Sequence, residues 1–259
     1  MSQTQNEELS IAKEAGELYE SSYKNLCEIL ENENLPDWVS LSLEELIAGK
    51  KWEELNNRFY ANLAFGTGGM RGRTIGKITT KAEKGKSGKG ETPQYAAVGS
   101  NTLNEITVLR ATRALFLYVR QWMAEQGIFE QPRLVVAHDV RHFSQKFCQL
   151  AALAWSRQGG YSMIFDGPRS TPQLSFPVRH QYAHAGIVIT ASHNPSHDNG
   201  FKAYFSDGAQ LVPPHAEKVV EKYKAIPIAE LLPFLDQNPT DDAPWTVLQA
   251  GDDLSYRAA

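Results

Sequence analysis

The sequence predicts an α/β fold in which a mostly parallel sheet lies between two layers of helices. Short apolar runs at Arg133–His138, Tyr161–Phe165 and Gly186–Thr190 have the composition of buried strands. Residues 144–157 and 171–179 lie between these runs and space their apolar side chains as helices do. Because strands and helices alternate at this spacing in βαβ units, we expect parallel strands with helices on both faces.

Further elements extend this pattern toward both ends of the chain. Apolar spacing predicts amphipathic helices over residues 7–33, near 41–63 and over 101–125. A further strand is expected at Phe201–Phe205, followed by a closing helix at Pro213–Tyr223.

Two segments depart from any regular pattern. Residues 64–76 hold five glycines in thirteen positions, which predicts a loop or an interrupted strand. Residues 77–95 hold five lysines and three glycines with few apolar side chains. We interpret this second segment as a solvated, flexible loop.

The organisation that follows has three parts. Residues 1–49 form a helical N-terminal extension, residues 50–225 form one α/β domain, and residues 226–259 form a weakly patterned link toward a further domain.

The composition excludes several classes of partner. The net charge is only -4 and no strongly basic segment is present, so neither nucleic acid nor an anionic membrane is an expected partner. The two cysteines, Cys27 and Cys148, suggest reduced thiols in a cytoplasmic protein rather than a disulfide framework. The polar N-terminus has no secretory signal, and no apolar run is long enough to span a bilayer.

The segment from Thr190 to Lys202 is the first candidate for a functional site. It reads Thr-Ala-Ser-His-Asn-Pro-Ser-His-Asp-Asn-Gly-Phe-Lys and directly follows a buried strand. Ligands of open α/β sheets bind at the carboxyl ends of strands. We expect Ser192 and Lys202 to face one cavity, because the chain re-enters a strand at Lys202.

Two other interpretations of this region are weaker. A serine hydrolase would place its serine in Gly-x-Ser-x-Gly at a strand-to-helix turn, whereas Pro195 prevents a helix from starting after Ser192. The pairs His193/His197 and His180/His184 have the four-residue spacing of metal ligands on a helix. We interpret them as solvent-facing or hydrogen-bonded histidines, because no third ligand accompanies either pair.

Several segments together resemble the α-D-phosphohexomutase family, which comprises phosphoglucomutases and phosphomannomutases. Thr190-Ala-Ser-His-Asn-Pro with Asp-Asn-Gly-Phe-Lys202 resembles the active-serine loop of that family. Further segments that resemble the family, in the family order, are Phe65-Gly-Thr-Gly-Gly-Met-Arg-Gly72, Asn101-Thr-Leu-Asn-Glu-Ile-Thr-Val108, His138-Asp-Val-Arg-His-Phe-Ser144 and Ser170-Thr-Pro-Gln-Leu-Ser-Phe176. The N-terminal extension is most similar to the longer phosphoglucomutase and phosphopentomutase-like branch.

The resemblance implies a phosphotransferase isomerase that interconverts sugar 1- and 6-phosphates, or pentose 1- and 5-phosphates, through a bisphosphate intermediate. It implies that Ser192 carries the phosphoryl group and that His193 and Lys202 contact the substrate or transfer protons. It also places Thr67 and Arg71 beside the phosphoserine and the sugar phosphate.

The resemblance further implies Mg²⁺ as cofactor and a sugar bisphosphate as activator. In the family an Asp-Gly-Asp-x-Asp-Arg loop on a second domain holds the ion, and the 259 residues contain no such loop. Ser192, through its phosphate, is therefore the one metal ligand expected from this chain. We expect the chain to be the first domain of a longer enzyme and to be inactive without the missing C-terminal domains. The alternative is a free-standing, non-enzymatic domain that binds phosphosugars or a partner.

Overall fold

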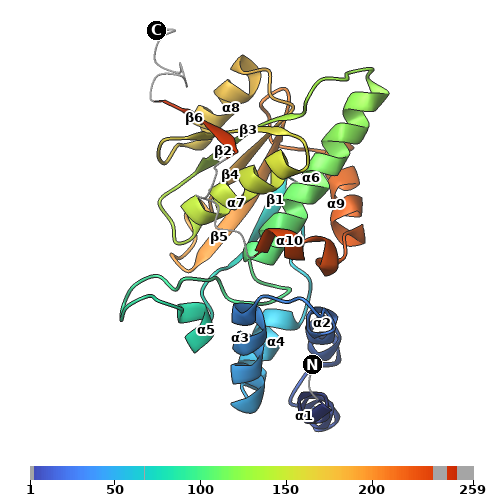
Figure 1. Ribbon diagram of the computed structural model, residues 1–259, viewed down its shortest axis with the longest axis vertical. Helices are drawn as coiled ribbons and strands as arrows, with labels where there is room; N and C mark the ends of the chain where they lie inside the picture. Colours follow the sequence, from blue (N-terminus) through green and yellow to red (C-terminus); the bar gives the residue numbers. More distant parts are fainter. Residues whose placement is uncertain (1–2, 67, 236–243, 250–259) are drawn as a thin grey trace. The chain divides into compact units, whose positions relative to one another are not determined.

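The chain divides into two units in the computed structural model, which describes residues 3–66, 68–235 and 244–249 (Figure 1). The first unit comprises residues 1–64, 72–107 and 227–236. The second unit comprises residues 65–71, 108–226 and 237–259, and it contains the predicted serine loop.

A six-stranded sheet, in the order β1-β5-β4-β2-β3-β6, organises the second unit (Figure 1). The strands are β1 (Gly69–Arg73), β2 (Arg133–His138), β3 (Tyr161–Phe165), β4 (Ala185–Ile189), β5 (Asp198–Phe205) and β6 (Trp245–Leu248). Strand β2 pairs in parallel with β3 and β4, β3 pairs in parallel with β6, and β4 and β5 are antiparallel. The predicted α/β fold with a mostly parallel sheet is confirmed.

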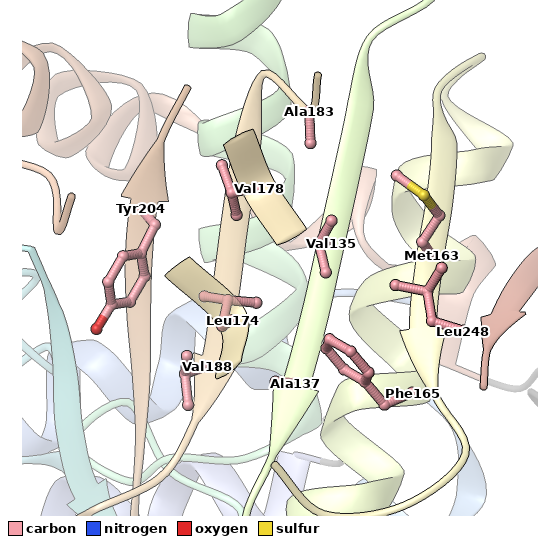
Figure 2. Close-up of a cluster of buried hydrophobic side chains, with 10 residues drawn as sticks. All are labelled: Val135, Ala137, Met163, Phe165, Leu174, Val178, Ala183, Val188, Tyr204 and Leu248. Carbon is pink, nitrogen blue, oxygen red and sulfur yellow. The ribbon is translucent and has the colours of Figure 1, made fainter. Parts of the chain in front are cut away.

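Helices α7 (Ser144–Arg157) and α8 (Thr171–His180) cover opposite faces of this sheet. Ser162 of β3 contacts Ser156 of α7 through their hydroxyls at 2.7 Å. The next residue, Met163, belongs instead to the buried cluster that α8 joins through Leu174 and Val178 (Figure 2). Successive side chains of a strand point to opposite faces, so the two helices lie in two separate layers.

The apolar cluster beneath α8 joins strands from across the sheet (Figure 2). Its members are Val135, Ala137, Met163, Phe165, Leu174, Val178, Ala183, Val188, Tyr204 and Leu248. Burying aliphatic and aromatic side chains of this size stabilises a fold by roughly 1.5–3 kcal/mol each. The cluster fixes the position of β4, from which the serine loop emerges.

The sequence located most elements of this unit correctly. Strands β2 and β3 and helix α7 have the predicted bounds, and α8 ends one residue later than predicted. Helices α6 (Glu105–Glu125) and α9 (His215–Ala225) also match predicted helices within a few residues. No strand was predicted within residues 226–259. The four residues of β6 form a strand by pairing with β3, which their sequence alone does not indicate. The predicted domain boundaries themselves stay a prediction.

The first unit is helical, with α1 (Gln3–Glu14), α2 (Glu20–Leu30), α3 (Asp37–Ala48), α4 (Trp52–Phe59), α5 (Lys81–Lys84), η1 (Ile228–Glu230) and α10 (Leu232–Leu235). The single helices predicted over 7–33 and near 41–63 are each two helices. Gly16 adopts φ +75° after α1, and Lys50 adopts φ 49° after α3. A residue with a left-handed backbone conformation ends an α-helix. The apolar spacing continues across both of these breaks, and for this reason the spacing alone did not reveal them.

The interpretation of residues 77–95 as a solvated, flexible loop is wrong for residues 80–84. Thr80 and Glu83 form a capping box at the start of α5. Glu83 is also fully buried, where it receives the guanidinium of Arg58 at 2.5 Å. Arg58 pairs with Glu54 at 2.7 Å as well, so two carboxylates surround one buried cation. Buried charges require such pairing, and a contact over 25 positions leaves no local signal in the sequence.

None of the helices in the described ranges is long and apolar enough to cross a lipid bilayer.

His184, just before β4, is a buried histidine with a fixed hydrogen-bonding role. Its Nδ1 accepts the backbone N–H of Arg133 at 3.0 Å, and its Nε2 lies 3.2 Å from Glu130 Oε1. The Nδ1 atom must therefore be unprotonated. Burial lowers the pKa of His184, the Glu130 carboxylate opposes this, and the charge of Arg133 lowers the pKa further, so that it lies below its ordinary value.

We expect His184 to make the fold less stable in acid. Its folded pKa lies below the unfolded value of about 6.5, so the unfolded state binds more protons and stability falls as pH falls below about 6.5. Urea unfolding between pH 7 and pH 5 should show a smaller loss for His184→Asn than for the unaltered chain. Equal slopes for the two proteins would contradict this prediction.

Candidate functional site

The serine loop connects two central, antiparallel strands of the sheet. It leaves β4 after Ile189 and enters β5 at Asp198. The carboxyl ends of the parallel strands β2 and β4 lie together, since His138 is paired with Ile189 and the N–H of Asp139 donates to the carbonyl of Ile189 at 3.1 Å. The loops that follow β2 and β4 thus meet at one edge of the sheet, where open α/β folds bind ligands.

Ser192 stands at an exposed position of this loop on a rigid base. Thr190 and Ala191 before it are buried, and Thr190 Oγ1 accepts the backbone N–H of Ser192 at 3.0 Å. Ser192 itself adopts φ 56°, in the left-handed region. Side chains other than glycine adopt this conformation at a cost of about 1–2 kcal/mol, so the surrounding loop must hold it.

Lys202 is a charged partner of the Ser192 hydroxyl. Its Nζ donates a hydrogen bond to Ser192 Oγ at 2.9 Å. Lys202 lies opposite Val188 in the antiparallel pairing of β4 with β5, which brings a residue ten positions along the chain back beside the serine. Burial lowers the pKa of Lys202, the positive charge of Arg71 lowers it further, and Asp139 opposes both. Lys202 therefore loses its proton more readily than an exposed lysine does.

Arg71 reaches the same loop from β1. Its Nη1 donates to Asn194 Oδ1 at 3.0 Å. This approach requires Gly69, because a Cβ at that position would overlap the carbonyl oxygen of Phe201 in β5. Residues Gly69–Arg73 of the glycine-rich segment thus form an edge strand of the sheet, and the missing side chain at Gly69 lets this strand approach β5 closely.

The other predicted site residues are less well defined by contacts. His193 follows Ser192 on the exposed part of the loop. Thr67 lies outside the described residues. The roles assigned to Ser192, His193, Lys202, Arg71 and Thr67 remain predictions; for three of them, Ser192, Lys202 and Arg71, the structure shows contacts within one site.

Sequence reasoning missed the residues that support the loop. Asp139 Oδ1 accepts the hydroxyl of Ser144 at 2.6 Å and the N–H of Arg141 at 2.9 Å. The Asn199 amide donates to Ser144 Oγ at 2.8 Å, and the guanidinium of Arg141 donates to backbone carbonyls of the serine loop. The quoted segment His138–Ser144 contains three of these residues, but only the tertiary structure shows what they contact.

The histidine pairs do not form metal sites in the described ranges, where no group of three or more His, Cys, Asp or Glu side chains converges. His184 is held by the hydrogen bonds described above, and His180 stacks on Phe176 with ring centroids 5.5 Å apart. Around Ser192, the carboxylate of Asp139 is already bonded to Ser144 and Arg141. The expectation that Ser192, through its phosphate, is the one Mg²⁺ ligand from this chain stays a prediction.

Comparison with known proteins identifies the family of this chain. The model of the α/β/α domain I of phosphoglucomutases and phosphomannomutases matches residues 94–229, more than half of the chain. The chain belongs to the phosphoglucomutase/phosphomannomutase family. The residues that match the family model include β2 to β5, the serine loop and Lys202.

Relatives of this family member include proteins named phosphopentomutase and proteins named phosphoglucomutase. A phosphopentomutase from Mus musculus is 31% identical over 211 residues, covering 78% of this chain and 30% of the relative. A phosphoglucomutase from Staphylococcus saprophyticus is 34% identical over 174 residues, covering 67% of this chain and 26% of the relative. A solved phosphoglucomutase/phosphomannomutase family protein from Burkholderia thailandensis is 20% identical, with a TM-score of 0.46, over 71% of this chain and 32% of that one. The matched part of the chain thus covers less than a third of the length of these relatives.

The conformation of Ser192 leads to a prediction about stability. Because glycine adopts positive φ without steric cost, Ser192→Gly should be more stable than Ser192→Ala by about 1 kcal/mol. The free energies of unfolding, measured in urea, give the comparison. At Ser196, whose φ is not positive, glycine should be no more stable than alanine. An alanine variant at position 192 as stable as the glycine variant would contradict the strained conformation.

Proposed function

We propose that this chain carries the phosphoryl-transfer serine of a phosphosugar mutase, an isomerase that moves a phosphoryl group between two hydroxyls of a sugar phosphate. The observation that carries the proposal is the 2.9 Å hydrogen bond between Lys202 Nζ and Ser192 Oγ at the carboxyl end of β4. The names of the relatives support a hexose or pentose phosphate as substrate. The two unpaired thiols, Cys27 and Cys148, suit a cytoplasmic location.

In the proposed reaction, His193 accepts one proton and Lys202 donates another. A hydroxyl of the sugar monophosphate attacks the phosphorus of phosphoserine, so that a sugar O–P bond forms as the Ser192 Oγ–P bond breaks. The proton of the attacking hydroxyl passes to His193, and the departing Ser192 Oγ takes a proton from the Lys202 ammonium. The reverse sequence, with the opposite phosphate of the bisphosphate, restores the phosphoserine. The lowered pKa of Lys202 suits a group that gives up and regains a proton.

Charge around Ser192 also favours a phosphorylated state. A phosphoserine adds a charge of about -1.5 to -2. Lys202 is in contact with the hydroxyl, Arg71 bonds the same loop through Asn194, and Arg141 bonds its backbone. Mg²⁺, when bound through the phosphate, would neutralise charge that develops during transfer. We infer that its carboxylate ligands and the distal phosphate site belong to the rest of the mutase, because the matched part of this chain covers only 30% and 26% of the two relatives.

A non-enzymatic domain that only binds phosphosugars explains these features less well. Binding a phosphate requires donors, which Arg71 and the backbone could supply, but it does not require an amine with a lowered pKa in contact with a serine hydroxyl. A nucleophile and a base within hydrogen-bond distance are the signature of group transfer.

The proposal predicts that Ser192 accepts phosphate from a sugar bisphosphate. The assay uses an exchange protein, in which this chain replaces the matching segment of the Staphylococcus saprophyticus phosphoglucomutase, incubated with glucose 1,6-bisphosphate and Mg²⁺. Peptide mass spectrometry should locate the phosphate on Ser192. Ser196→Ala should keep the label and Ser192→Ala should lose it. Phosphate on Ser196, or on no serine of the loop, would refute the assignment.

Lys202 should contribute to turnover far more than to folding. In a coupled assay of glucose 1-phosphate conversion, Lys202→Met in the exchange protein should lower kcat by about 10²–10⁴-fold, the usual contribution of an acid or base. Lys202→Arg should be similarly slow, because arginine keeps the charge but does not release its proton. Lys218→Met, at an exposed position on α9, is the matched control. The isolated 259-residue chain should show no turnover. Near-normal kcat in either Lys202 variant would exclude this role.

A further inference from the structure

Arg141 bonds the serine loop through its backbone, whereas Lys202 and Arg71 bond the side chains of Ser192 and Asn194. Arg141 lies in the loop after β2, and the two terminal nitrogens of its guanidinium donate to backbone carbonyls of the serine loop. Nη2 donates to the carbonyls of Ser192 at 2.8 Å and Asn194 at 2.6 Å. Nη1 donates to the carbonyls of Pro195 at 2.8 Å and Asp198 at 3.1 Å. One side chain thus holds four carbonyls that span the whole loop.

The guanidinium is itself fixed in position. Its Nε lies 3.4 Å from Asp139 Oδ2, and the side chain of Arg141 is only 13% exposed. Asp139 is anchored in turn by the Ser144 hydroxyl at the start of α7. Phe143, at φ 64°, packs against Phe147 of that helix, with ring centroids 5.7 Å apart. The loop that carries Arg141 is therefore tied to α7.

The serine loop needs such a support for two physical reasons. Ser192 adopts φ 56°, which an L-residue keeps only when its surroundings impose it. The loop also directs several carbonyls toward one point, and without a donor their dipoles would repel each other and leave the backbone unsatisfied. The planar guanidinium, with donors spread over a fixed fork, can satisfy several carbonyls at once, whereas a lysine ammonium is a single compact point.

We propose that Arg141 is a positioning residue that locks the backbone of the serine loop and so presents Ser192 Oγ to Lys202 and to the phosphoryl group. The inference rests on the proposed function for its catalytic purpose, while the backbone lock stands on the geometry alone. Misplacement of a reacting group by about 1 Å can slow a reaction roughly 10²-fold. Loss of Arg141 should therefore slow phosphoryl transfer even though the residue exchanges no proton with the substrate.

The experiment measures the backbone and the chemistry separately. Amide hydrogen exchange of the 259-residue chain, followed by mass spectrometry, should show faster exchange in a peptide covering residues 190–200 for Arg141→Ala and Arg141→Lys. Exchange in β2 and in α7 beyond its first turn should stay unchanged. In the exchange protein, phosphate transfer from glucose 1,6-bisphosphate to Ser192 should slow by about 10–100-fold in both variants.

Chemical rescue distinguishes positioning from a general loss of structure. Guanidinium at low millimolar concentration should restore part of the transfer rate of Arg141→Ala, and the same concentration of ammonium should not. Arg133→Lys is the matched control, since Arg133 begins β2 at the opposite end of that strand and bonds the Gln181 carbonyl at 3.4 Å. It should change neither the exchange of the loop nor the transfer rate.

Each alternative outcome has a definite meaning. Unchanged exchange of the loop in both Arg141 variants would overturn the lock. A loosened loop with an undiminished transfer rate would overturn its role in positioning the serine, as would rescue by ammonium equal to rescue by guanidinium. If the unaltered exchange protein takes no phosphate on Ser192 while the loop of the variants is loosened, the proposed function fails and the catalytic purpose of the lock fails with it, but the lock itself is supported.

Discussion

The antiparallel pairing of β4 with β5 is the constraint on which the site depends. It sets Lys202 opposite Val188 and returns the chain past the carboxyl end of β4, so that a lysine ten residues after Ser192 touches its hydroxyl. A register shift of one residue would turn Lys202 to the other face of the sheet. The register is fixed on one side by the apolar cluster that includes Val188 and Tyr204. On the other side it is fixed by the close approach of Gly69 to Phe201.

The loop between these strands stores strain where the chemistry is proposed. Ser192 and Phe143, in the two loops that meet at this edge, both have positive φ although neither is glycine. Hydrogen bonds compensate for this strain, since Arg141 joins the two loops and Asn199, in β5, donates to the carbonyl of His142 in the loop after β2. A serine held in this way needs little reorganisation before it reacts, which is how preorganised sites lower a barrier.

The same chain uses buried charge for a purely structural purpose in its first unit. Arg58 is buried with Glu54 and Glu83, and its guanidinium also donates to the carbonyl of Ile78 at 2.5 Å. The two carboxylates raise the pKa of Arg58 and outweigh its desolvation, so the group stays charged. Removing one partner of such a cluster would leave an uncompensated charge in the interior. Around Lys202, by contrast, the nearby arginine adds to desolvation and makes the proton easier to lose.

Local periodicity and a motif of adjacent residues were enough to predict the fold class, the bounds of β2, β3 and α7, and the segment that holds the candidate site. Other features depend on partners distant in sequence and follow only from the folded chain. The tertiary structure orders the turn at Glu83 through Arg58 and adds β6 to the sheet through β3. It also brings Arg141 next to the serine loop, over fifty positions further along the chain, because the pairing of β2 with β4 places the two loops at one edge of the sheet.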